Sequence, residues 1–154
     1  MSRIQLALNV DSLEESVAFY STLFGVTPAK TRPGYANFAL QEPPLKLVLI
    51  ENPGQGGTIN HLGVEVADTD TVDAEQTRLH RAGLASVDER GTTCCYAEQD
   101  KFWVKNAPDG ERWEVYTVLA DSETFAATAQ DDGVEQSCCG SEPRELAPTA
   151  SACC

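Results

Sequence analysis

The chain has 154 residues and a mass of 16.6 kDa, a length that allows one compact domain or a small domain with a tail. Its 24 acidic and 11 basic residues give a formal charge of -13, which argues against binding to nucleic acid or to an anionic membrane. No apolar run approaches the roughly 20 residues of a membrane span, and the N-terminus lacks the apolar stretch of a secretory signal. We therefore expect a cytoplasmic protein.

A weak internal repeat organises the first 120 residues. The alternating strand pattern of residues 4–10 matches that of residues 60–66 at an offset of 56, and a helical pattern follows each strand. The predicted helix boundaries are Ser12 and Gly25 for the first helix, and Asp70 and Gly83 for the second.

Shorter strand patterns follow each predicted helix. They lie at residues 35–40 and 45–50 in the first copy, and at 84–90, 102–105 and 112–118 in the second. The order predicts an α+β fold of two βαβββ modules, at about residues 1–55 and 56–120 of one domain. Because each helix covers one face of its strands, the uncovered faces are expected to enclose a shared cleft.

Residues 121–154 differ from the preceding domain. They carry a net charge of -6 and few large apolar side chains, so we expect an acidic, disordered tail. The six cysteines form three adjacent pairs: Cys94–Cys95 in the domain, and Cys138–Cys139 and Cys153–Cys154 in the tail. Adjacent cysteines fit neither zinc spacings nor a disulfide framework, but two thiolates can bind one soft centre such as As(III) or cadmium. The alternative for Cys94 and Cys95 is that they merely fill a strand.

Strand alternation predicts which residues face the cleft. Gln5 and His61 occupy equivalent positions of the repeat, on the faces opposite the apolar side chains. Glu114, if it faces inward, completes a three-ligand metal site of amide oxygen, imidazole and carboxylate. The candidate fourth ligands are Glu51 and Glu65, although the hairpin alignment places an apolar residue, Val48 or Leu49, opposite Glu114.

Several segments carry a family resemblance. The closing Pro108-Asp109-Gly110-Glu111-Arg112-Trp113-Glu114 and the ligand positions on the first, fifth and last strands resemble the vicinal oxygen chelate superfamily, which includes glyoxalase I, extradiol dioxygenases and antibiotic-resistance proteins. Residues 2–10, 33–38, 44–49, 60–66, 93–97, 99–101 and 112–116 resemble one subfamily. It contains carbon–arsenic lyases and cadmium-induced proteins.

The resemblance implies an Fe(II)- and O2-dependent enzyme that converts trivalent organoarsenicals, such as methylarsonous acid, to arsenite. Gln5, His61 and Glu114 would bind iron, although Mn, Co or Ni would also fit these ligands. Cys94 and Cys95 would bind arsenic. Further expected roles are the substrate pocket for Tyr96, Lys101 and Phe102, with Trp103 as a further wall of that pocket, and metalloid capture by the tail residues Cys138, Cys139, Cys153 and Cys154.

Two other functions stay open at this point. A non-catalytic cadmium-binding resistance protein would also use three cysteine pairs. A glyoxalase-type isomerase shares the fold, but usually needs a second acidic ligand on the fourth strand. The expected partners are a small-molecule arsenical and O2, without nucleic acid or membrane, and the chain is expected to be a monomer or a homodimer.

Overall fold

The computed structural model describes residues 2–125; residues 1 and 126–154, with the two cysteine pairs of the tail, lie outside the described residues. The elements in chain order are β1 (Arg3–Val10), α1 (Leu13–Phe24), β2 (Lys30–Arg32), β3 (Tyr35–Leu40), β4 (Leu45–Glu51), β5 (Ile59–Glu65), α2 (Thr69–Arg81), β6 (Ser86–Cys94), β7 (Ala97–Val104) and β8 (Trp113–Asp121). Neither helix in this part of the chain is long and apolar enough to cross a membrane.

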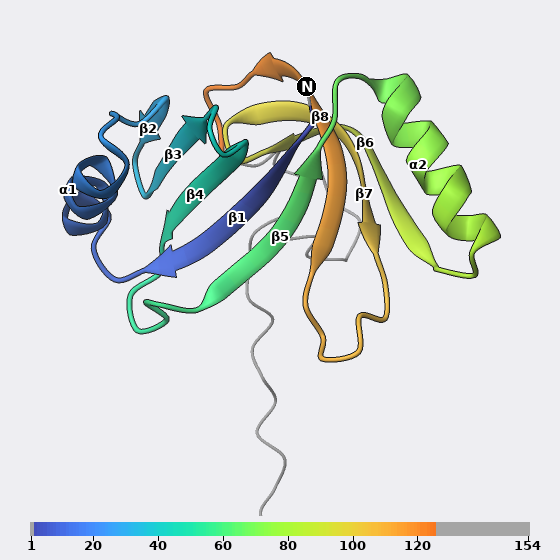
Figure 1. Ribbon diagram of the computed structural model, residues 1–154, viewed down its shortest axis with the longest axis horizontal. Coiled ribbons are helices and arrows are strands. Elements are labelled where there is room, and N and C mark those ends of the chain that lie inside the picture. Colours follow the sequence, from blue (N-terminus) through green and yellow to red (C-terminus); the bar gives the residue numbers. More distant parts are fainter. Residues whose placement is uncertain (1, 126–154) are drawn as a thin grey trace, which may run out of the picture.

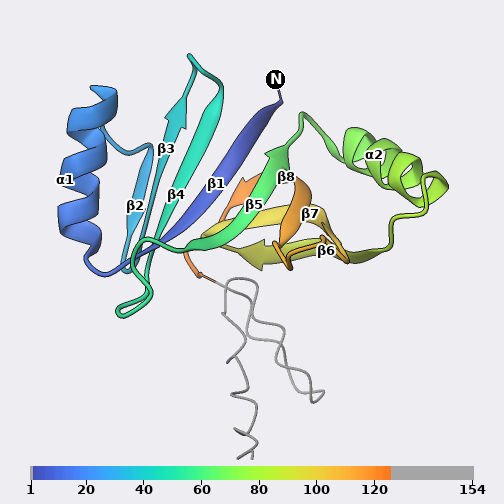
Figure 2. The same ribbon diagram turned by 60° about the horizontal axis from the view of Figure 1, so that its bottom comes forward.

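All eight strands belong to one sheet, in the order β2-β3-β4-β1-β5-β8-β7-β6. The predicted α+β fold of two βαβββ units is confirmed, and the units join through the antiparallel pairing of β1 with β5. Helices α1 and α2 lie at opposite ends of the sheet, on its outer side (Figure 1). Figure 2 shows that the sheet bends, so its other face is concave.

The helix boundaries follow from local capping. As predicted, Ser12 caps α1 by accepting a hydrogen bond from a first-turn backbone N–H, and Gly25 ends the helix in the left-handed conformation, with φ of 67°. Helix α2 begins two residues earlier than predicted. Asp68 is its N-cap, rather than Asp70, because the Asp68 carboxylate accepts hydrogen bonds from both the backbone N–H and the hydroxyl of Thr71.

The last three strands, β6, β7 and β8, are longer than their sequence patterns indicate. The predicted segments at 84–90 and 102–105 extend to meet at a hairpin, in which Cys94 pairs with Ala97. Much of β6 is polar and exposed, which hides a strand pattern that relies on apolar alternation. The short edge strand β2 was not predicted, whereas the strand at Tyr35–Leu40 has the bounds expected.

Apolar side chains on the outer face of the sheet pack beneath the helices. The α1 side contains Val10, Phe38, Leu47 and Leu49. The α2 side contains Val66, Val72, Phe102 and Val115. These two clusters take one set of alternating residues from each strand, so the other set, including most of the polar candidates, faces the concave side.

Candidate metal centre and thiol pair

Three neighbouring strands bring the predicted ligands together. Gly63 on β5 pairs with Gln5 of β1 on one side and with Glu114 of β8 on the other. A Cβ atom at Gly63 would lie 3.3 Å from the Gln5 Cβ and 3.2 Å from the Glu114 Cγ. The missing side chain therefore leaves room for Gln5 and Glu114 to approach each other. His61, two residues before Gly63, faces the same side of the sheet.

The polar ends of the three side chains converge. Gln5 Nε2 donates to Glu114 Oε1 at 2.8 Å and lies 3.0 Å from His61 Nε2, while His61 Nε2 lies 3.4 Å from Glu114 Oε1. Each of the three residues is at most 4 % exposed. The sequence prediction that these residues lie together therefore agrees with their positions.

A chain of amides holds His61. Its Nδ1 lies 2.7 Å from Asn60 Oδ1, while Asn60 Nδ2 donates to Asn9 Oδ1 at 2.9 Å. Because the oxygen of Asn60 faces the ring, His61 donates a hydrogen bond from Nδ1, and this contact turns Nε2 into the site. A hydrogen bond of this kind is typical of histidines that bind metals.

Glu114 is ionised despite its burial. Its Oε2 accepts a hydrogen bond from Lys101 Nζ at 3.1 Å, and Lys101 is fully buried. Burial raises the pKa of Glu114, but Lys101 and His61 together lower it more, to about 2. The site therefore contains a permanent carboxylate.

The donor set fits a divalent metal ion. A carboxylate, an imidazole nitrogen and an amide oxygen are ligands that Fe(II) and Mn(II) accept. Among residues 2–125 no three His, Cys, Asp or Glu side chains cluster as a metal site, so binding here needs the Gln5 amide as the third ligand. Gln5 would bind through its oxygen, which requires that the amide turn that atom toward His61.

The position of a fourth protein ligand is apolar. Val48 on β4 pairs with Ala7 of β1, as Glu114 of β8 pairs with Gly63 of β5. Val48 is 2 % exposed on the concave face, whereas Leu49 packs under α1 on the other face. The equivalent of Glu114 in the first unit is thus Val48, which decides between the two residues that the sequence left open.

Neither candidate acidic fourth ligand joins the three-residue site. Glu51 accepts a hydrogen bond from the backbone N–H of Leu13 at the start of α1, with an Oε2–N distance of 2.8 Å. Glu65 instead lies beside Tyr116, with 2.9 Å between Oε2 and the phenolic oxygen, and pairs with Arg3. Both carboxylates have other roles, so we withdraw them as ligands.

A second polar cluster surrounds Tyr116 beside the three-residue site. The Tyr116 hydroxyl contacts Gln5 Oε1 at 2.6 Å, Glu65 Oε2 at 2.9 Å and Lys46 Nζ at 3.1 Å. Burial and the neighbouring carboxylates raise the pKa of Tyr116, so the phenol keeps its proton. Lys46 was missed in the sequence, although a lysine on the concave face of an otherwise apolar strand was a usable signal.

The thiols of Cys94 and Cys95 lie at the β6–β7 hairpin. Cys94 ends β6, and the turn is formed by Cys95 and Tyr96, with φ of 55° and 60°. Two-residue turns with positive φ usually contain Asn or Gly, because side chains strain this conformation by about 1 kcal/mol each. The two Sγ atoms lie 3.3 Å apart. The alternative that both cysteines simply fill a strand is therefore wrong for Cys95.

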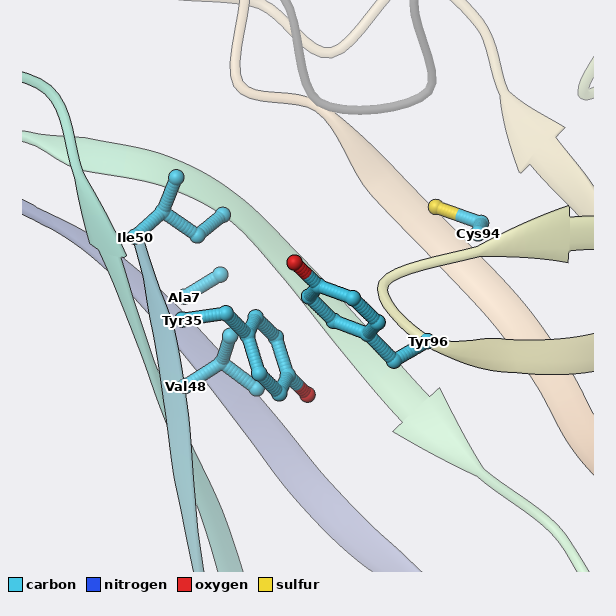
Figure 3. Packing of buried hydrophobic residues seen from close by; sticks show 6 residues of the cluster. All are labelled: Ala7, Tyr35, Val48, Ile50, Cys94 and Tyr96. Atoms are coloured by element: carbon cyan, nitrogen blue, oxygen red, sulfur yellow. The ribbon is translucent and has the colours of Figure 1, made fainter. Parts of the chain in front are cut away.

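The thiol pair belongs to the apolar cluster of the concave face. Figure 3 shows Cys94 and Tyr96 reaching from the hairpin toward Tyr35, Ile50 and Val48 on the opposite wall. The rings of Tyr35 and Tyr96 lie 5.5 Å apart between their centroids, and Phe125 packs 5.6 Å from Tyr96. An organic group attached to a thiol-bound atom would thus meet aromatic walls.

The three pocket candidates lie in different places. Tyr96 is in the aromatic cluster, and Lys101 contacts Glu114. Phe102 lies on the opposite face, fully buried beneath α2, because neighbouring residues of a strand alternate in direction. We therefore remove Phe102 from the pocket; Trp103 faces the site instead, with its ring 5.6 Å from that of His61.

Most of the chain matches the profile of one protein family. The profile of the Glyoxalase/Bleomycin resistance protein/Dioxygenase superfamily matches residues 3–115. The chain belongs to this superfamily. The Mn(II)-bound glyoxalase from Novosphingobium aromaticivorans has a similar structure, with a TM-score of 0.56 and 20 % identity, over 84 % of this chain and 44 % of that one. This likeness shows the vicinal oxygen chelate fold that the sequence predicted.

Two relatives are more similar in sequence. The cadmium-induced protein CadI from Mycobacterium tuberculosis is 63 % identical over 143 residues, covering 90 % of this chain and 93 % of the relative. The trivalent organoarsenical cleaving enzyme from Thermomonospora curvata is 54 % identical over 159 aligned positions and the full length of both chains. The names of the two relatives match the two kinds of protein that the sequence resembles.

Proposed function

We propose that this superfamily member is an Fe(II)- and O2-dependent carbon–arsenic lyase that converts methylarsonous acid and similar trivalent organoarsenicals to arsenite. The observation that carries the proposal is that two groups of side chains lie on the same concave face: the buried Gln5–His61–Glu114 cluster, and two thiols 3.3 Å apart. The relative named as an organoarsenical cleaving enzyme, similar over its full length, supports the same function.

Cys94 and Cys95 would anchor the substrate as thiolates on trivalent arsenic. Their sulfur atoms are far outside the roughly 2.05 Å of a disulfide bond, but close enough to bind the same atom. The left-handed turn fixes this arrangement before the substrate arrives. Anchoring of this kind lowers the entropic part of a reaction barrier, by up to about 7 to 11 kcal/mol in favourable cases.

Gln5, His61 and Glu114 would hold the metal, which when bound supplies the redox centre for reaction with O2. The overall reaction balances without a further reductant, because methylarsonous acid and one O2 contain the atoms of arsenous acid and formaldehyde. Tyr35, Tyr96 and Phe125 would exclude water from the organic group. Lys101 would keep Glu114 ionised, and Val48 would leave the fourth protein ligand position open.

The apolar Val48 also bears on the glyoxalase-type alternative. Such an isomerase is expected to use an acidic residue at that position, and Val48 has no ligand atom. A cytoplasmic location suits the proposal, since thiols stay reduced in that compartment.

Cadmium sequestration is the second candidate function. It is favoured by the vicinal thiols and by the relative named cadmium-induced protein, at 63 % identity. Sequestration would need the thiols alone, whereas cleavage also needs the cluster at Glu114. The two functions therefore differ in what a Glu114 variant does.

The test is anaerobic loading with Fe(II), followed by air and methylarsonous acid, with chromatography of the arsenic species. We expect arsenite only with both iron and air, together with an equal amount of formaldehyde. Glu114→Ala should abolish turnover but still bind the arsenical, and Cys95→Ser should weaken arsenical binding but still bind iron. Arsenical that is bound but stays intact with iron and air would favour sequestration.

A further inference from the structure

The Tyr116 hydroxyl has more acceptor neighbours than it has protons. It contacts Gln5 Oε1 at 2.6 Å, Glu65 Oε2 at 2.9 Å and the Lys46 ammonium at 3.1 Å. A phenol has one proton to donate and lone pairs to accept. Lys46 can only donate, so it takes a lone pair. Tyr116 must then donate its single proton to either Gln5 Oε1 or Glu65 Oε2. The one that receives no proton faces the Tyr116 oxygen without a hydrogen between them.

The opposite end of the Gln5 amide faces two acceptors. Gln5 Nε2 donates to Glu114 Oε1 at 2.8 Å and lies 3.0 Å from His61 Nε2, while His61 Nδ1 lies 2.7 Å from the acceptor Asn60 Oδ1. This orientation presents the amide nitrogen to the metal-free site. It cannot bind a metal ion, because an amide offers cations its oxygen and not its nitrogen.

Rotating the Gln5 amide by half a turn exchanges its oxygen and nitrogen, which changes the contacts both with Tyr116 and with His61 and Glu114. The nitrogen then donates to the Tyr116 oxygen, and Tyr116 is free to give its proton to the Glu65 carboxylate. Every contact of Tyr116 now contains one proton, and a hydrogen bond to a carboxylate is stronger than one to an amide. At the other end, three acceptor atoms face each other, from Gln5, His61 and Glu114. That arrangement is stable only with a cation among them.

We infer that Tyr116, held between Glu65 and Lys46, is a positioning residue that couples metal binding to rotation of the Gln5 amide. In the metal-free protein the amide nitrogen faces His61, and the Tyr116 proton faces Gln5. In the metal-bound protein the amide oxygen faces the metal, and the Tyr116 proton faces Glu65. Glu65 is thus no ligand itself, but favours the ligand orientation of Gln5. The inference rests on the metal site proposed above.

The direct test is NMR of the full chain, without metal and with Zn(II) added until the His61 ring signals stop shifting. Zinc serves as a diamagnetic probe that accepts nitrogen and oxygen ligands. We expect the side-chain NH2 protons of Gln5 to show contacts with His61 Hε1 before addition, and with the ring of Tyr116 after it. Amide contacts that stay with His61 in the zinc-bound protein would overturn the inference. His61 signals that never shift would overturn the proposed metal site as well.

A double-mutant cycle separates the action of Glu65 through Tyr116 from its charge. We expect Glu65→Gln to weaken Mn(II) binding, measured by anaerobic calorimetry, about tenfold in the wild type. In the Tyr116→Phe background, which has no hydroxyl to orient, the same change should weaken binding only two- to threefold. An equal loss in both backgrounds would mean that Glu65 acts by charge alone. If Tyr116→Phe does not fold, the NMR contacts of Gln5 in the Glu65→Gln variant test the inference instead. In that variant the Gln5 amide should keep its contacts with His61 at zinc concentrations that rotate the amide in the wild type.

Discussion

The carboxylate of Glu114 is stabilised inside the protein by one lysine. Lys101 is fully buried, lies 3.1 Å from Glu114 and packs over the Trp103 ring. A buried ion pair contributes little compared with an apolar pair, but removing one partner leaves an uncompensated charge. The role of Lys101 is therefore visible in how stability depends on pH.

Lys101→Met should destabilise the metal-free protein in a pH-dependent way. The pKa of Glu114 is lowered on folding from 4.5 to about 2, so its ionisation stabilises the fold above pH 4.5, and this stabilisation is lost as the pH falls toward 2. Without Lys101, burial raises this pKa above its unfolded value, so the ionised Glu114 destabilises the fold as the pH rises above 4.5. We expect the free energy of unfolding in urea, with a chelator present, to fall by about 3 kcal/mol at pH 7 and by less at pH 4.

The matched control for this variant is Lys105→Met, because Lys105 is exposed just beyond the same strand. It should change stability by no more than about 0.5 kcal/mol at either pH. A loss in Lys101→Met of the same size at pH 4 and pH 7 would contradict the role given to the Glu114 charge.

Gly63 is a residue whose missing side chain matters. An added Cβ would lie 3.2 to 3.3 Å from Glu114, Gln5 and Tyr116, so these neighbours would have to move by a few tenths of an ångström. We expect Gly63→Ala to lower stability by about 1 to 3 kcal/mol, as overpacking does, and to weaken Mn(II) binding about tenfold. Calorimetry of the folded variant checks this. Unchanged metal affinity would show that the spacing of Gln5 and Glu114 does not depend on Gly63.

At the level of elements, the β6–β7 hairpin is held by chain segments far away in the sequence. The backbone N–H of Cys95 donates to the carbonyl of Phe125 at 2.6 Å, and that of Ser122 donates to the carbonyl of Tyr96 at 3.0 Å. Lys30 of β2 also donates to the Tyr96 carbonyl, at 2.9 Å. The segment after β8 thus ties down the strained turn that carries the thiols.

Phe125→Ala should loosen this hairpin. Its ring packs against Tyr35 and Tyr96, so its loss removes one aromatic wall and weakens the tie to Cys95. We expect the KM for methylarsonous acid to rise about fivefold to tenfold, while kcat and Mn(II) affinity stay within twofold of the wild type. Phe19→Ala is the matched control, because Phe19 is 60 % exposed on α1. Equal KM values for the two variants would exclude a role of the Phe125 ring.

At the scale of the whole molecule, the structure explains where the tail leaves the domain. Phe125, the last described residue, contacts the thiol hairpin, and residues 126–154, with Cys138–Cys139 and Cys153–Cys154, follow it in the sequence. The hypothesis that these thiols capture arsenicals and deliver them concerns residues outside the described part of the chain. The structure contributes the position of Phe125, the residue that precedes the tail, at the thiol hairpin.

A chain ending at Phe125 tests that hypothesis and leaves the hairpin contacts in place. If the tail cysteines collect substrate, the shortened chain should keep the maximal rate, because Cys94 and Cys95 remain. Its rate at low substrate should fall several-fold. Turnover measured across methylarsonous acid concentrations distinguishes the two regimes. Equal rates for the short and full chains at the lowest concentrations would remove the tail from the mechanism.

The sequence determined the parts of this protein that depend on local periodicity. Two repeated strand–helix patterns predicted the two units, and strand alternation placed Gln5 and His61 on one face, because the side-chain period of a strand is two. The inward direction of Glu114 was only a condition of the predicted site. The same rule shows that Phe102 and Lys101 cannot both line the cleft, so the expectation for Phe102 could have been corrected without a structure.

Only the tertiary structure decided the features that depend on register and on contacts between distant segments. Strand pairing identified Val48 as the fourth position, and the hairpin gave Cys95 its left-handed turn. The cluster of Tyr116, Glu65 and Lys46 joins β8, β5 and β4, and β5 and β8 are neighbours in the sheet although α2, β6 and β7 separate them in the chain. The physical reason is that a strand's own residues fix which side chains share a face, whereas its neighbours fix which side chains meet.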